Sequence, residues 1–104
     1  MNIFIDKFAF FNNMTPKDIE RISKALADPT RLTILQAVRK SGCMQCAQIR
    51  EMIDLAQPSI SHHLKQLTDS GLLVIQKEGR NIRYTIDHEV LTGYTNFLST
   101  LVHK

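Results

Sequence analysis

The sequence predicts a mainly α-helical domain that carries one small β-hairpin. Three observations support this prediction. Apolar residues recur at helical spacing along most of the chain, residues 82–86 alternate between apolar and polar side chains, and glycines separate the two patterns. The 104 residues correspond to one domain, residues 1–104. The expected order of elements is four helices, two strands and a final helix (α-α-α-α-β-β-α).

The first of these helices is expected to begin after Thr15. A threonine side chain can cap free N–H groups, Pro16 fits the first helical position, and Asp18 suits the first turn. The apolar stripe that follows consists of Ile19, Ile22 and Leu26.

The second helix repeats the same start at Asp28 and Pro29 and is expected over residues 29–40. Gly42 provides the stop. We expect the inward-facing residues of this helix to be Leu32, Leu35 and Val38.

A helix-turn-helix is predicted over residues 46–70. Its first helix, residues 46–53, should bury Ile49, Met52 and Ile53, and residues 54–56 form the turn. The second helix begins near Gln57 or Pro58 and ends before Gly71.

A hairpin, or wing, is predicted over residues 72–86, with strands at 72–78 and 82–86 around a turn at 79–81. Ile82, Tyr84 and Ile86 give the return strand one apolar face.

The net charge of the chain is +3 and its isoelectric point is about 9.1. Residues 57–85 hold four cations against two carboxylates, and three of these cations lie on the hairpin: Lys77, Arg80 and Arg83. A polar helix followed by a basic hairpin is typical of a winged DNA-binding unit.

The second helix of the helix-turn-helix has a polar outer face. When Ile60 is placed at the centre of the buried face, Leu64 and Leu67 fall beside it. We therefore expect this helix to offer its first two turns to base edges and a lysine to phosphate, through Gln57, Ser59, Ser61, His62 and Lys65. His63 lies nearer the buried side and is interpreted as a half-buried structural histidine.

The two ends of the chain carry more apolar surface than a small domain needs for its own core. We interpret residues 1–14 and the expected helix at 88–102 as dimerisation segments, although both could pack within one chain. The interface candidates are Phe4, Phe8, Phe11, Leu91, Tyr94, Phe97, Leu98 and Leu101.

Three segments together resemble the ArsR/SmtB family of bacterial winged helix-turn-helix repressors: ALADPTRLTIL at 25–35, SISHHLKQLTDSGLL at 59–73, and KEGRNIRYTI at 77–86. The resemblance spans roughly residues 19–101. It implies a homodimer that binds a double-stranded DNA operator and is released by an inducer. It also implies that the polar helix reads the major groove while Arg80 and Arg83 place the wing on the DNA backbone or in the minor groove.

The sensing sites of that family match poorly. The resemblance places a thiolate pair of the family's metal sensors at Gln45 and Ala47, so Cys43 and Cys46 miss that register. A CxxC spacing allows either a soft-metal site or a thiol redox switch across a tight turn, with Cys46 made reactive by a helix N-terminus. Alternatively, Cys46 is a small core residue and Cys43 an incidental thiol. No resident cofactor or metal is assigned.

A metal site confined to the last helix is not expected. His88 and His103 are 15 residues apart, which is about four helical turns. No pattern in the sequence supports a site shared between two subunits.

The predicted function is a DNA-binding transcriptional regulator, expected to be a homodimeric repressor in the cytoplasm. The alternative is a winged-helix module that binds another protein, but such a module should show large apolar residues where this helix shows serine, histidine, lysine and glutamine.

The chain has no nucleophile–base pair, glycine-rich phosphate loop or paired carboxylates, so an enzyme is not expected. No apolar run reaches the length of a membrane span, about 18 residues. Asp6 interrupts the apolar start, so no signal peptide is expected either.

Overall fold

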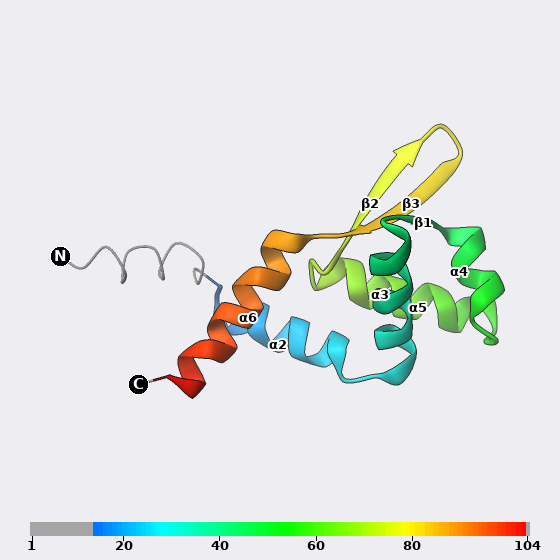
Figure 1. The fold of residues 1–104 in the computed structure, drawn as a ribbon. Helices are drawn as coiled ribbons and strands as arrows, with labels where there is room; N and C mark the ends of the chain where they lie inside the picture. The colour runs from blue at the N-terminus through cyan, green and yellow to red at the C-terminus, as the bar shows by residue number, and fades with distance from the viewer. Residues whose placement is uncertain (1–13, 104) are drawn as a thin grey trace.

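The computed structural model describes residues 14–103 and contains the expected mainly α-helical fold with a hairpin (Figure 1). Most predicted boundaries are confirmed to within one or two residues. The elements, in chain order, are α2 (Pro16–Leu26), α3 (Pro29–Ser41), β1 (Met44–Gln45), α4 (Cys46–Met52), α5 (Gln57–Asp69), β2 (Leu73–Glu78), β3 (Asn81–Ile86) and α6 (His88–Val102). Phe4, Phe8, Phe11 and the rest of residues 1–13 lie outside the described residues.

Side-chain caps fix the starts of α2 and α3, as the sequence predicted. The hydroxyl of Thr15 accepts a hydrogen bond from the Asp18 N–H at 3.1 Å, and the Asp18 carboxylate accepts one from the Thr15 N–H at 3.0 Å. The Asp28 carboxylate accepts from the Arg31 N–H at 3.0 Å. Each bond satisfies an N–H group that has no partner within its own helix.

Two glycines end helices where the chain must turn. Gly42 follows α3 with a φ of +84°, a conformation that other residues rarely adopt. Gly71, with a φ of +85°, joins α5 to β2, and a side chain there would lie 3.5 Å from Val90 of α6. These turns direct α4 and the hairpin away from the helices that precede them.

The sheet has a third strand that the sequence did not reveal. The strand order is β1-β3-β2, and both pairings are antiparallel. In β1, Met44 pairs with Tyr84 and Gln45 pairs with Arg83. Two residues are too few to show an alternating pattern. This short strand joins the beginning of α4 to the return strand of the wing.

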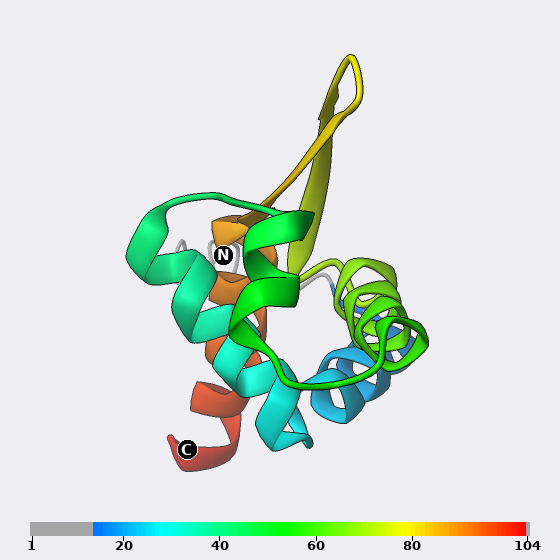
Figure 2. The same ribbon diagram turned by 90° about the vertical axis from the view of Figure 1, so that its right-hand side faces the viewer.

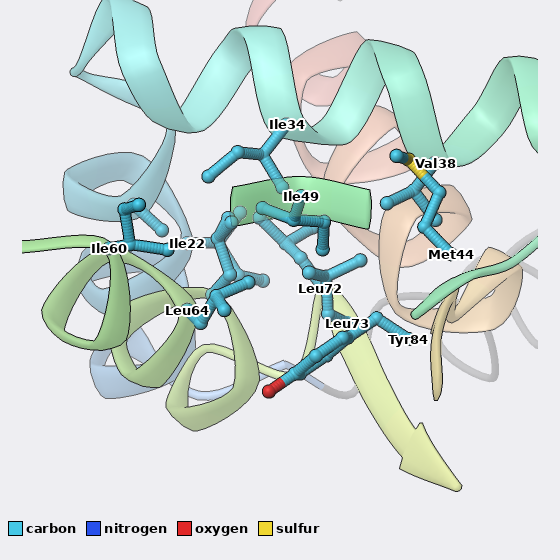
Figure 3. Packing of buried hydrophobic residues seen from close by; sticks show 12 residues of the cluster. Ile22, Ile34, Val38, Met44, Ile49, Ile60, Leu64, Leu72, Leu73 and Tyr84 are labelled. Atoms are coloured by element: carbon cyan, nitrogen blue, oxygen red, sulfur yellow. The ribbon is translucent and has the colours of Figure 1, made fainter. Parts of the chain in front are cut away.

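One apolar core lies between the helices and the base of the hairpin (Figure 3). Side chains from α2, α3, α4, α5 and the sheet point toward one another there, and the most buried are Ile22, Ile34, Val38, Ile49, Leu67, Leu72 and Leu73. The apolar face predicted for β3 is confirmed. Tyr84 is buried, and Ile82 and Ile86 pack against the core.

Two predicted core residues are exposed instead. Leu32 is 42% exposed because Arg31, Ile34 and Val38 form the buried stripe of α3. The inward face predicted for α3 consisted of Leu32, Leu35 and Val38 and did not include Arg31. Met52, the last residue of α4, is 39% exposed, and Ile49 fills the core from that helix.

The hairpin projects from the helical body, whereas α6 lies on the opposite side of the molecule from α4 (Figures 1 and 2). No helix within residues 14–103 is long and apolar enough to span a membrane.

Candidate nucleic-acid interface

Three buried leucine and isoleucine side chains anchor α5, and they are the ones that the sequence predicted. Ile60, Leu64 and Leu67 are 3%, 4% and 0% exposed. Their spacing of four and three residues places them on one face of the helix. The opposite face is left to solvent, and it carries every predicted base or phosphate contact of this helix: Gln57, Ser59, Ser61, His62 and Lys65.

The amino end of α5 is open. Its capping residue is Ala56, whose side chain makes no capping bond, and Pro58 has no N–H to satisfy. The N–H groups of Ser59 and Ile60 both donate to the Ala56 carbonyl, at 3.0 and 3.1 Å. The first turn therefore presents Gln57 and Ser59 without a covering side chain, as a helix that enters a groove requires.

Two outward residues of α5 are bonded along the helix. The Lys65 ammonium lies 2.9 Å from the Asp69 carboxylate, and the ring of His62 lies 3.0 Å from the side-chain amide of Gln66. Exposed pairs of this kind contribute little stability, about 0.5 kcal/mol. A phosphate or a base can therefore replace either partner at low cost.

His63 is half-buried, which confirms the structural role expected for it. Its Nδ1 atom lies 3.1 Å from a guanidinium nitrogen of Arg31 and 3.8 Å from the carboxylate of Asp28. The hydrogen bond from the Arg31 N–H lowers the pKa of Asp28 below its ordinary value, and the Arg31 charge acts in the same direction. Sequence reasoning missed Arg31 because a charged residue inside a helical pattern is ordinarily solvated.

The three cations predicted on the wing do not share one face. Lys77 pairs with Ile82, on the face that continues from the core, whereas Arg83 pairs with Gln76 on the other face. Arg80 is exposed in the turn between β2 and β3. The basic wing thus presents cations on both sides and at its tip.

Arg83 lies in a polar row across the sheet. Its cross-strand partners are Gln45 in β1 and Gln76 in β2, so two carboxamide residues flank one guanidinium residue on the same face. Arg83 itself is half-buried. The two glutamines carried no sequence signal, because β1 was not predicted.

Cys43 and Cys46 lie on either side of β1. Cys43 is exposed, whereas Cys46 is half-buried at the start of α4 and packs against the core. The tight turn proposed for a redox pair is absent because extended strand residues separate the two thiols. An extended path of this length places their Cα atoms about 10 Å apart, whereas a disulfide needs less than about 7 Å.

Cys46 lies within electrostatic reach of Tyr84. Burial raises the pKa of the Tyr84 hydroxyl above its ordinary value, and a charge on the Cys46 thiol raises it further. Within the described part of the chain, no three histidine, cysteine or acidic side chains converge to form a metal site.

The C-terminal helix has a divided apolar surface. Leu91 and Tyr94 pack against the core, and the Tyr94 hydroxyl lies 2.8 Å from the hydroxyl of Ser23 in α2. Phe97 is half-buried. Beyond it the predicted interface residues face solvent, with Leu98 41% and Leu101 70% exposed.

Comparisons with known proteins agree with this geometry. A family model described as a helix-turn-helix domain matches residues 26–76. The arsenical resistance operon repressor of Staphylococcus xylosus is 36% identical over 78 residues, which cover 75% of this chain and 74% of that protein. The transcriptional repressor SdpR of Bacillus subtilis is 33% identical over 86 residues, with 83% and 94% covered. A crystal structure of an ArsR family transcriptional regulator superposes with a TM-score of 0.77 at 30% identity, covering 86% of this chain and 91% of that one.

Proposed function

This chain belongs to the ArsR family of winged helix-turn-helix transcriptional regulators, and we propose that it is a homodimeric repressor that binds an operator and releases it on a chemical signal. Its relatives include repressors named for arsenical resistance and SdpR, a repressor matched over nearly its whole length. A repressor acts by occupying DNA, so the proposal requires a surface suited to a duplex.

The observation that carries the proposal is the exposed polar face of α5. Ile60, Leu64 and Leu67 hold the helix by its other side, so the face with Gln57 and Ser61 is free to enter the major groove. Amides and hydroxyls can bond to base edges, and the positive end of the helix dipole favours phosphate. The wing adds Lys77, Arg80 and Arg83 for backbone contacts.

Dimerisation is proposed from the exposed end of α6. Leu98, Leu101 and Val102 are 41%, 70% and 76% exposed. An apolar helix face of this kind is suited to pack against the same face of a second copy of the chain. Two subunits would then place two α5 helices on successive half-sites. Sedimentation should give a dimer for the native chain and a monomer for Leu101→Lys, whereas Lys17→Ala, an exposed substitution on α2, should leave the dimer intact.

The test of DNA binding is selection from the fragmented genome of the source organism. The purified protein should retain a small set of duplexes that share a two-fold sequence, and its affinity for them should fall steeply as salt rises. A flat salt dependence, or the retention of proteins but no duplex, would instead favour an interaction module.

The signal is proposed to act through the thiols if it is an oxidant, a reactive sulfur species or a soft metal ion. Release from the selected duplex should be measured for Cys43→Ser and Cys46→Ser with and without each agent. A loss of release confined to Cys46→Ser would assign the sensing to the thiol beside Tyr84. Unchanged release in both variants would remove the cysteines from the mechanism.

A further inference from the structure

Arg31 is a buried cation whose guanidinium group is hydrogen-bonded to other groups of the protein. The residue is only 8% exposed. Its Nε donates to the Ala25 carbonyl at 2.7 Å, and one terminal nitrogen donates to the Lys24 carbonyl at 2.9 Å. These carbonyls belong to the last turn of α2, where carbonyl groups lack helical partners. Arg31 therefore holds the end of α2 from within α3.

The remaining terminal nitrogen of Arg31 reaches the helix that carries the candidate base contacts. It lies 3.1 Å from Nδ1 of His63 in α5. A guanidinium group can only donate, so this Nδ1 must be the unprotonated acceptor and the ring proton must lie on Nε2. The 3.1 Å contact is therefore a hydrogen bond only for the neutral ring with its proton on Nε2.

This bond is a specific link between α5 and the rest of the domain. Within residues 14–103, it is the only hydrogen bond from a side chain of α5 to a side chain of another helix or strand. The other α5 anchors are apolar, and apolar contacts tolerate small rotations of a helix more readily than a directed bond does. The bond is thus suited to set the direction in which the neighbouring His62 and Ser61 face.

We propose that Arg31 and His63 are positioning residues for operator binding: Arg31, anchored on the end of α2, orients α5 through the unprotonated Nδ1 of His63, and protonation of His63 releases that bond. This inference rests on the proposed DNA-binding function, but its structural half can be tested without DNA.

Protonation of His63 would replace its hydrogen bond with Arg31 by one with Asp28. A protonated Nδ1 can no longer accept from Arg31, and it would place two cations side by side. The Asp28 carboxylate, 3.8 Å away, becomes the available acceptor, although its Oδ2 already caps α3 by accepting from the Arg31 N–H. The other titratable ring close to His63 is that of His62, whose centroid lies 6.1 Å away. Protonation therefore weakens the link to α2 and disturbs the start of α3.

The first test measures the ring nitrogens of His63 by 15N NMR in the DNA-free protein, with His63→Asn to assign the signals. The proposal expects the neutral ring to carry its proton on Nε2 and none on Nδ1. A neutral ring with its proton on Nδ1 would overturn the proposal whatever the protein binds.

The second test measures affinity for the selected duplex at about pH 8 and about pH 5.5, the range over which histidines change charge. His63→Asn is the reference, because it keeps His62, whose protonation at the DNA surface would itself strengthen binding as the pH falls. Relative to that reference, the native chain should lose about tenfold in affinity on acidification, the effect of losing one buried hydrogen bond to a charged group.

Two substitutions at position 63 separate the bond from the bulk of the ring. Asparagine places an oxygen near the position of Nδ1 and does not titrate, so His63→Asn should keep most of the affinity and lose the pH dependence. His63→Leu keeps the bulk without the acceptor and should bind about tenfold more weakly at both pH values. If His63→Asn follows the same pH profile as the native chain, the proposal is wrong. If the native chain binds no duplex at all, the proposed function fails, and the NMR result alone decides the Arg31–His63 bond.

Discussion

Lys77 and Arg83 lie on opposite faces of the β2–β3 hairpin, because Lys77 pairs with Ile82 and Arg83 with Gln76. In the proposed complex, their side chains would therefore reach different phosphate groups. We expect Lys77→Ala and Arg83→Ala each to reduce the slope of log affinity against log salt by about 1. Titration of the selected duplex at several salt concentrations measures this slope.

The double variant provides the sharper comparison. Two independent contacts should contribute free energies that add to within about 0.5 kcal/mol. The slope of log affinity against log salt should therefore fall by about 2 in the double variant. Lys17→Ala, on α2, is the matched control and should leave the slope unchanged. A double variant that binds no more weakly than either single variant would show that both cations serve the same phosphate.

Gln57 is the residue of α5 expected to read sequence. It is exposed at the open helix start, and its carboxamide can bond to two atoms of an adenine. Gln57→Ala should reduce the discrimination between base pairs at one operator position by about 1–3 kcal/mol. The affinities for duplexes altered at the other positions should all change by the same factor. The measurement is binding to a set of duplexes that differ from the selected one by single base pairs. A uniform loss across the whole set would mean that Gln57 contacts only the backbone.

Tyr84 should ionise at a higher pH than a tyrosine in an unfolded chain. Burial and then the Cys46 charge raise the pKa of Tyr84 in the folded protein, so the fold favours the neutral hydroxyl. The resulting stability is present below about pH 10, where an unfolded tyrosine ionises, and is lost as the pH rises through the raised pKa. Absorbance titration should show a later step, above about pH 10, that Tyr84→Phe removes.

The same titration tests the contribution of Cys46. Cys46→Ser should shift the later step part of the way back, because it removes the thiolate charge and leaves the burial. Cys43→Ser is the matched control, since Cys43 lies on the other side of β1 and does not contribute to the Tyr84 pKa. An unchanged titration of Cys46→Ser would place the thiol outside electrostatic reach of Tyr84.

Mild oxidation should not join Cys43 to Cys46 within one folded chain, because β1 holds them about 10 Å apart. Mass spectrometry after oxidation should show free or singly modified thiols, with the exposed Cys43 modified faster than the half-buried Cys46. In about 6 M urea, where the chain is unfolded, the same oxidant should form the bond. A rapid internal disulfide under native conditions would show that β1 opens readily.

Much of the fold could be predicted because its signals are local. Thr15, Asp28 and Gly42 each act through their immediate neighbours, and the anchoring residues of α5 follow from a helical period of 3.6 residues. The exposure of the predicted α5 contacts follows from the same period. These features need no knowledge of distant parts of the chain.

The features that could not be predicted depend on contacts between distant segments. Arg31 is buried because the end of α2 and His63, 32 positions along the chain, supply its partners. β1 exists because Met44 meets Tyr84. The separation of Lys77 from Arg83 follows from the hairpin register, which the composition of the wing does not reveal.

Gln45 is both the last residue of β1 and the capping residue of α4, and it pairs with Arg83 in the middle of the wing. The helix-turn-helix and the wing are consequently braced at a second point, besides the covalent turn at Gly71. The distance from the amino end of α5 to the hairpin is therefore fixed within the chain. In the proposed complex, the length of an operator half-site would therefore follow from this brace rather than from the residues that touch the bases.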